Sequence, residues 1–210
     1  MKGVSTTVYV VDDDDSIRRA MTRLFRSAGF LVQTFESAAE FLVAPPADGL
    51  ACLLLDLRLP VISGTELQQK LLQRGIDLPV VMLTGQGDVP SAVLAMKQGA
   101  VDFLSKPVDN DVLLNTVRQA VKDLSHRRRQ MLDVQEFESR VQSLTSREHE
   151  IMLHVITGML NKQIAARLAI TETTVKVHRG RVMEKTCVAS LAELVRLCER
   201  AGYSPEGDSP

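Results

Sequence analysis

The chain has 210 residues, 45% of them hydrophobic and 24% charged, a composition typical of a soluble globular protein with one large domain or two small ones. Its 25 basic and 26 acidic side chains give a net charge of −1, which by itself argues against a nucleic-acid partner. The net charge conceals a difference between the two parts of the chain. Residues 1–125 carry 15 acidic and 12 basic side chains, whereas residues 126–210 carry 11 acidic and 13 basic ones.

The cysteines and the apolar segments indicate the compartment. Cys52, Cys187 and Cys198 show neither a CxxC motif nor zinc-ligand spacing, so we expect three buried, reduced thiols. The N-terminal segment has no apolar core before the four acids at 12–15, and no run approaches the 18 apolar residues of a membrane helix. We therefore expect a cytoplasmic protein with no membrane partner.

Residues 1–125 alternate β-rich runs with helical patterns. Strands are predicted at 6–11, 30–35, 51–56, 79–83 and 100–105, and most of these runs are almost continuously apolar, as in strands covered on both faces. Ser37 with Glu40 and Ser63 with Glu66 fit the capping box that opens a helix. Five strands alternating with five helices predict an α/β fold with a doubly wound, five-stranded parallel sheet.

The second half of the chain has a helical pattern. Residues 109–143 are predicted to be helical throughout, with a first apolar stripe that packs on the sheet and a second that fits a coiled-coil-like linker. The second stripe comprises Val134, Phe137, Val141 and Leu144. Further helices are predicted at 146–157, 162–168, 172–186 and 191–200, two of them opened by Thr145 with Glu148 and Ser190 with Glu193. These helices predict an all-α domain followed by a frayed tail.

Polar side chains stand at the ends of four predicted strands. Asp12 and Asp13 follow the first strand, Asp56 ends the third, and Thr84 and Lys106 follow the fourth and fifth. In a parallel sheet the carboxyl ends of the strands share one edge, where ligands bind. Three neighbouring carboxylates favour a hard divalent cation such as Mg²⁺, and a hydroxyl and an ammonium are suited to hold a phosphoryl group on a carboxylate.

Four motifs in order resemble the receiver domains of bacterial two-component response regulators. They are VVDDD at 10–14, LLLDLRLPVISG at 53–64, VVMLTGQGD at 80–88 and AVDFLSKP at 100–107. The resemblance implies a flavodoxin-like (CheY-like) receiver over residues 5–124. It also implies that Asp56 is the phosphoacceptor, that Mg²⁺ or Mn²⁺ is held by Asp12, Asp13, Asp56 and the carbonyl of Arg58, and that the Lys106–Pro107 peptide bond is cis.

The resemblance further implies a switch. Thr84 contacts the phosphoryl group, Lys106 pairs with one of its oxygens, and Phe103 turns inward on activation. Other interpretations stay open: Asp14 and Asp15 read as an acidic helix start, and Phe103 as ordinary core packing. An aspartyl-nucleophile phosphatase is the enzymatic alternative, but it usually has a second acid where this chain has Arg58.

Residues 143–198 resemble the LuxR-type helix-turn-helix domain, chiefly through NKQIAARLAIT and TVKVH. The whole chain resembles the NarL/FixJ class, nearest the FixJ branch, and a sigma-factor region is the closest false positive. The implied organisation is a receiver at 5–124, a helical linker at 125–142, a four-helix DNA-binding domain at 143–201 and a flexible tail at 202–210.

Helical spacing places a DNA-contacting face on residues 172–186. Val175, His178 and Val182 share the opposite face and are expected to pack inward. The expected DNA contacts come from this helix and the start of the preceding one. They are Asn161, Lys162, Thr173, Thr174, Lys176, Val177, Arg179 and Arg181. Gly180 and Ala169 depart from the usual family residues, and Ala169 is disfavoured if its backbone is left-handed.

The two resemblances together imply a transcription regulator that is not an enzyme beyond its own phosphorylation chemistry. A sensor histidine kinase donates a phosphoryl group to Asp56, the receiver dimerises through a face near Val93 and Lys97, and the dimer binds promoter DNA. RNA polymerase is a candidate further partner. Release of an inhibitory contact between the domains is the alternative mechanism. A phosphorylation-insensitive DNA-binding protein with a structural receiver is the alternative function.

Overall fold

A five-stranded parallel sheet forms the centre of the first part of the chain. The computed structural model describes residues 6–44, 49–85 and 89–204, so residues 86–88 of the VVMLTGQGD motif and residues 205–210 of the expected tail lie outside it. The strands are β1 (Thr7–Val11), β2 (Leu31–Phe35), β3 (Ala51–Asp56), β4 (Val80–Thr84) and β5 (Asp102–Ser105). Their order, β2-β1-β3-β4-β5, confirms the predicted doubly wound parallel sheet.

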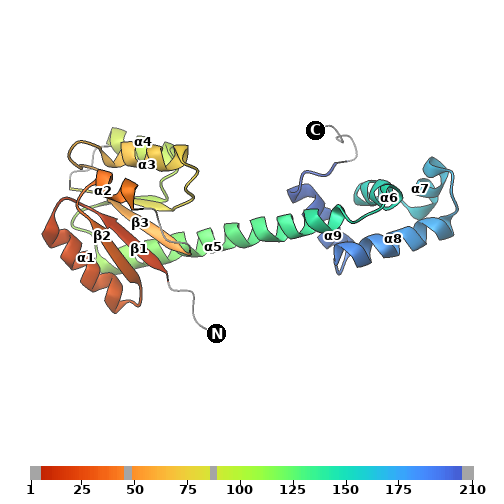
Figure 1. The fold of residues 1–210 in the computed structure, drawn as a ribbon, viewed down its shortest axis with the longest axis horizontal. Helices are drawn as coiled ribbons and strands as arrows, with labels where there is room; N and C mark the ends of the chain where they lie inside the picture. Colours follow the sequence, from red (N-terminus) through yellow and green to blue (C-terminus); the bar gives the residue numbers. More distant parts are fainter. Residues whose placement is uncertain (1–5, 45–48, 86–88, 205–210) are drawn as a thin grey trace. The chain divides into compact units, whose positions relative to one another are not determined.

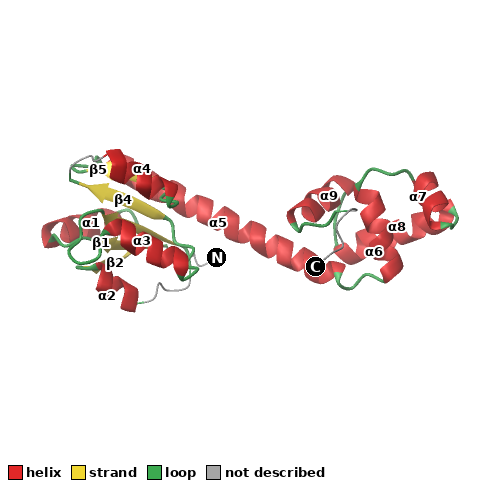
Figure 2. Ribbon diagram, turned by 90° about the horizontal axis from the view of Figure 1, so that it is seen from above, coloured by secondary structure: helices red, strands yellow, loops and turns green. Residues whose placement is uncertain are grey.

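Helices cover both faces of the sheet, as Figures 1 and 2 show. The first face carries α1 (Asp15–Ser27) and the beginning of α5 (Asn110–Val141). The other face carries α2 (Ala38–Val43), α3 (Gly64–Gln73) and α4 (Val89–Lys97). Because strands β1, β3 and β4 lie between these two layers, every residue of the three is buried.

Two apolar cores hold the layers together. On the side of α2 and α3, Phe41 packs edge to face with both Tyr9 and Phe35, and the ring centroids of Phe35 and Phe41 lie 5.1 Å apart. On the opposite side, Phe25 of α1 packs in one cluster with Leu113 and Val117 of α5. The predicted first stripe of the long helix therefore packs on the sheet as expected.

The chain separates into two units, residues 1–127 and 128–210. The second unit contains the last part of α5 and the helices α6 (Ser146–Ile156), α7 (Asn161–Leu168), α8 (Glu172–Thr186) and α9 (Leu191–Arg200). Its core includes Phe137 and Val141 of α5 together with Ile151, Val175 and Leu194. The second half of the segment predicted as a linker, residues 125–142, therefore packs into the core of the helical unit.

Capping residues explain the helix starts. Ser63 and Thr145 each accept a hydrogen bond from the backbone N–H three residues on, and Glu66 and Glu148 return the interaction, as predicted. Ser37 and Ser190 accept from the N–H groups of Glu40 and Glu193, but those two glutamates bind the N–H of the residue before the cap. These two helices therefore begin with a variant of the predicted box.

One of the cysteine predictions is wrong. All three thiols are free and Cys52 and Cys198 are buried, but Cys187 is exposed because it caps the C-terminus of α8 in a left-handed conformation with φ 54°. Burial raises the pKa of Cys52 to about 12 and that of Cys198 to about 11. No described helix is long and apolar enough to cross a bilayer.

Candidate functional site

An acidic cluster lies at the carboxyl edge of the sheet, where the sequence predicts it. Asp12 and Asp13 follow β1 and Asp56 ends β3, and each offers a carboxylate oxygen that lies within 4.8 Å of the other two. Asp12 and Asp56 are buried, whereas Asp13 is exposed. Since β1 and β3 are neighbours in the sheet, their pairing brings these acids together.

Lys106 joins the two buried acids. Its Nζ donates to Oδ2 of Asp12 and to Oδ2 of Asp56, both at 2.6 Å. The lysine follows β5, and its backbone N–H donates to the carbonyl of Thr84 at 2.6 Å, which ties it to the end of β4. The Lys106–Pro107 bond is cis, as the resemblance implies. The ammonium thus neutralises part of the negative charge of the two carboxylates, which would otherwise repel each other.

The pKa values follow from burial and from this bridge. Burial raises the pKa of Asp12 and outweighs the lowering by the hydrogen bond from Lys106. Burial alone would lower the pKa of Lys106, but its hydrogen bonds and charge interactions with Asp12 and Asp56 raise it instead. The lysine therefore stays charged throughout the neutral range, as a group that binds an anionic phosphoryl oxygen must.

Backbone donors and one arginine hold the acids in place. The N–H of Asp14 donates to Oδ1 of Asp12 at 2.9 Å, and the N–H of Arg58 donates to Oδ1 of Asp56 at 3.0 Å. Arg18 donates from Nη1 to the backbone carbonyl of Asp12 at 2.7 Å. With each Oδ1 engaged in this way, both Oδ2 atoms face the lysine.

The two expected switch residues occupy different environments. Thr84 is fully buried at the end of β4, and its carbonyl binds the N–H of Lys106. Phe103 of β5 is partly buried and packs against the core cluster on the α2–α4 side of the sheet. The structure therefore brings Thr84 next to Lys106 along the backbone and places the ring of Phe103 against the core.

The cluster fits a hard divalent cation. Three carboxylates from two neighbouring strand ends supply only oxygen donors, which Mg²⁺ and Mn²⁺ prefer, and exposed Asp13 leaves the cluster open to solvent on one side. Such a cation would supply charge neutralisation beside Asp56, and Lys106 already provides part of it.

In the second unit, α8 presents one polar and one apolar face. Val175 and Val182 are buried as predicted, and His178 is half-buried with its Nδ1 enclosed and without a hydrogen-bond partner among the described residues. Lys176 and Val177 lie on the exposed face of the helix. The other expected contacts that are also exposed are Lys162, Thr173 and Arg181.

Two expected DNA contacts bind each other. Arg179 of α8 donates from Nη1 to Oδ1 of Asn161 at 2.6 Å, so the first residue of α7 is tied to the middle of α8. Thr174 forms part of the helix cap, because its N–H donates to Oγ1 of Thr171 at 3.1 Å. The Thr174 hydroxyl also lies 2.9 Å from that of Thr171, so all three side chains have partners within the second unit, and the bond between Asn161 and Arg179 links α7 to α8.

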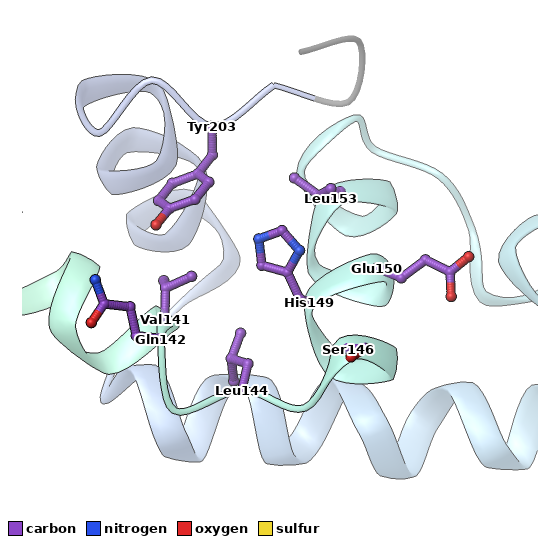
Figure 3. Close-up of a pocket in the computed structure, with 8 residues that line it drawn as sticks. All are labelled: Val141, Gln142, Leu144, Ser146, His149, Glu150, Leu153 and Tyr203. Atoms are coloured by element: carbon purple, nitrogen blue, oxygen red, sulfur yellow. The ribbon is translucent and has the colours of Figure 1, made fainter. Parts of the chain in front are cut away.

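An exposed face of α4 and a pocket in the second unit are two further features of the protein surface. Val93 and Lys97 are exposed on α4, beside exposed Leu94 and Met96. A pocket of about 550 Å³ in the second unit, drawn in Figure 3, lies between the end of α5, one face of α6 and Tyr203, whose ring stands 5.9 Å from that of His149. The pocket contains none of the residues that the sequence assigns to a site.

The comparisons with known proteins agree with this architecture. The model of the response regulator receiver domain matches residues 8–118, and that of the luxR family of bacterial regulatory proteins matches residues 142–198. Nodulation protein W of Bradyrhizobium diazoefficiens is 46% identical over 94% of this chain and 87% of its own length. The transcriptional regulatory protein FixJ of Azorhizobium caulinodans is 41% identical over 98% and 97%. The chain belongs to the FixJ-type response regulators.

Solved structures place this response regulator in the same group. Response regulator StyR matches with a TM-score of 0.75 and 44% identity over 93% of this chain and 99% of that one. Full-length FixJ from B. japonicum matches with a TM-score of 0.59 and 40% identity over 93% and 97%. The receiver and LuxR-type domains mark the chain as a response regulator that acts in the regulation of transcription.

Sequence reasoning missed two residues that shape the receiver site of this response regulator. Arg18 received no role, although a basic residue one turn into the helix after an acidic run is a recognisable signal. Gly64 is the last residue of the LLLDLRLPVISG motif, and a Cβ there would lie 2.4 Å from the carbonyl oxygen of Asp56. Only glycine permits this approach, and its place in the motif could have shown it.

Proposed function

We propose that this response regulator accepts a phosphoryl group on Asp56 from a sensor histidine kinase and that the modification controls its binding to promoter DNA. The observation that supports the proposal most directly is the pair of 2.6 Å contacts from Lys106 to Asp12 and Asp56. An ammonium held between the acceptor carboxylate and a second acid is placed to bind a phosphoryl oxygen as soon as one arrives.

The chemistry uses the groups of the acidic cluster. A carboxylate oxygen of Asp56 forms a bond to phosphorus while the bond from phosphorus to the donor nitrogen breaks, and the leaving imidazole takes up a proton from solvent. Asp12, Asp13, Asp56 and the carbonyl of Arg58 would hold Mg²⁺, which supplies charge neutralisation during transfer. Thr84 and Lys106 then bind the phosphoryl oxygens.

The output is a change in the exposed face of α4. Thr84 moves toward the phosphoryl group and Phe103 turns inward, which alters the surface beside it. The exposed apolar side chains Val93, Leu94 and Met96, together with Lys97, form a face suited to self-association. The receiver therefore dimerises on phosphorylation.

Dimerisation brings two copies of α8 to one DNA site. Lys176 and Val177 are exposed where base edges would lie, and Lys162, Thr173 and Arg181 are placed to contact phosphates and the groove. Residues 161–185 carry six basic against two acidic side chains, a modest excess for one domain. Two domains acting together gain affinity without further contacts.

The test of the acceptor is direct labelling. With Mg²⁺ and acetyl phosphate, the wild-type protein is expected to gain one acid-labile phosphoryl group by intact mass, and Asp56→Asn none. Asp14→Asn, which alters a neighbouring exposed acid outside the cluster, is the matched control and is expected to label like the wild type. Labelling of Asp56→Asn at the wild-type level would contradict the assignment.

A further inference from the structure

Val61 adopts a backbone conformation that a valine rarely takes. It lies in the loop between β3 and α3 with φ 69°, and the N–H of Ile62 donates to the carbonyl of Pro60 at 2.8 Å, which closes a three-residue γ-turn around it. A γ-turn with positive φ is rare and strained, and a β-branched side chain makes it more costly. Glycine would occupy this position without strain.

The Val61 side chain is not packed against the described part of the chain, so packing does not offset this strain. Val61 is 99% exposed, whereas Leu57 and Leu59 of the same loop are buried and Ile62 packs against the core. A buried valine could offset its backbone strain by removing apolar surface from water, but this one cannot. Strained residues of this kind gather at functional sites, because a partner rather than the fold makes use of them.

The loop that carries Val61 begins directly after Asp56, the proposed phosphoacceptor. The loop leaves the sheet at Asp56 and ends at Gly64, the first residue of α3. The N–H of Gly64 donates to the carbonyl of Leu57 at 3.0 Å, and its Cα lies against the backbone of Asp56. Val61 is three residues from Gly64, so their Cα atoms are at most about 11 Å apart. Val61 thus lies in the exposed part of the loop that begins directly after Asp56, and we call this exposed part of the loop the rim of the acidic site.

We propose that Val61 is an apolar docking contact for the protein that donates the phosphoryl group. The inference rests on the proposed function, because it names a residue that the donor meets. Asp56 is only 8% exposed, so a phosphohistidine can reach it only if the surrounding protein surface of the donor covers the rim. A small donor such as acetyl phosphate enters without covering the rim, which separates docking from chemistry.

Two substitutions and one control test the docking role. Val61→Ala removes the two methyl groups and keeps the backbone conformation, and Val61→Gly also relieves the strain. Val43→Ala truncates a valine that is 83% exposed at the end of α2. Phosphotransfer is measured from each autophosphorylated sensor kinase of the source genome and, separately, from acetyl phosphate, always with the full chain.

We expect Val61→Ala and Val61→Gly to lower kcat/KM for transfer from the fastest kinase about tenfold, as loss of one apolar anchor does. Labelling by acetyl phosphate should stay within about twofold of wild type, and Val43→Ala should match wild type with both donors. Val61→Gly should also raise Tm by about 2–4 °C through relief of strain, so its slower transfer could not be a folding defect.

Three outcomes contradict the docking role. Unchanged transfer from the kinase shows that Val61 is not a contact, and equal slowing with both donors shows that it acts on the acidic site itself. A wild-type protein that labels with acetyl phosphate but with none of the kinases has no donor surface for Val61 to meet. Failure of the wild type to label with acetyl phosphate overturns the proposed function instead.

Discussion

Lys106 is the residue on which the balance of the acidic cluster depends. Its ammonium is shared between Asp12 and Asp56, and a cation bound to the same acids would take over part of its role. Removing one partner of a buried charge pair leaves the other uncompensated, which costs about 3–5 kcal/mol in fully buried sites and less in an open one.

Lys106→Met should therefore be less stable than wild type by about 2 kcal/mol in EDTA, and Mg²⁺ should restore most of the loss because the unopposed carboxylates bind it more tightly. Urea unfolding with EDTA and with Mg²⁺ measures both effects. Lys97→Met, at an exposed lysine of α4, is the control. Equal stabilisation of wild type and Lys106→Met by Mg²⁺ would contradict this account of the cluster.

Gly64 tests the backbone support of Asp56. An alanine Cβ would overlap the carbonyl oxygen of Asp56, so Gly64→Ala should displace the end of β3, destabilise the receiver by about 1–3 kcal/mol and slow labelling by acetyl phosphate. Gly180→Ala is the contrast, because a Cβ there meets open space on a helix and should stabilise by about 0.5–1 kcal/mol. Denaturant midpoints compare the two, and a neutral Gly64→Ala would refute the close approach.

For single residues, the sequence predicts where a side chain lies in the fold better than it predicts which side chain it contacts. Asp12, Asp56, Thr84 and Lys106 could be placed together because the ends of parallel strands share one edge. The mutual pairing of Asn161 with Arg179 could not be predicted, because a hydrogen bond between two helices depends on their crossing geometry. Helical periodicity shows only which face of each helix the two side chains occupy.

Among the elements, helices are predicted more closely than strands. Residues 172–186 and 191–200 have the predicted bounds because Thr171 and Ser190 cap them. The fifth strand is predicted at 100–105 but begins at Asp102. The N–H of Ala100 donates to the carbonyl of Ala95 in α4, and bonding to β4 starts with the N–H of Val101, which donates to the carbonyl of Val80. Ala100 thus belongs to the C-terminal turn of α4, although its apolar side chain is compatible with a strand.

The turn between α7 and α8 contains a strained residue. Ala169 has φ 52° and ψ 42°, the left-handed conformation anticipated from the sequence as a cost. Ala169→Gly should stabilise the second unit by about 0.5–1 kcal/mol, because glycine adopts this conformation freely. Thermal unfolding checks the change, with Ala166→Gly, on the exposed face of α7, as a control that should destabilise. A loss of stability in Ala169→Gly would contradict the strain.

The ion pair between α6 and α8 predicts a response to acid. Two hydrogen bonds lower the pKa of Glu148 to about 2: the larger effect comes from Lys185, at 2.6 Å, and a smaller one from the N–H of Thr145. A lowered pKa in the folded state gives stability that is complete above the ordinary pKa of 4.5 and is lost as pH falls toward 2.

Glu148→Gln should therefore cost about 1–3 kcal/mol at pH 7, and its difference from wild type should shrink between pH 5 and pH 2 because protonation removes the same interaction from the wild type. Urea unfolding across this pH range measures the difference. Glu150→Gln, at an exposed acid of α6, should show a far smaller one. A difference that stays constant from pH 7 to pH 2 would contradict the role of the pair.

The two parts of the chain that differ in net charge also carry different domains. The acidic excess of residues 1–125 belongs to the receiver, whose carboxylates gather at one edge of the sheet, and the basic excess of residues 126–210 belongs to the LuxR-type unit. The helix α5 contributes to both cores, through Leu113 in the first and Phe137 in the second. Periodicity identified both stripes but could not show which core receives the second.

The DNA affinity of the full chain, measured with and without phosphorylation, shows most directly whether Asp56 controls the protein. On fragments selected from a random-sequence pool, treatment with acetyl phosphate and Mg²⁺ is expected to lower Kd at least about tenfold, as pairing of two weak domains allows. Asp56→Asn should not respond. Equal affinity of the phosphorylated and unphosphorylated wild type would contradict the claim that Asp56 controls DNA binding.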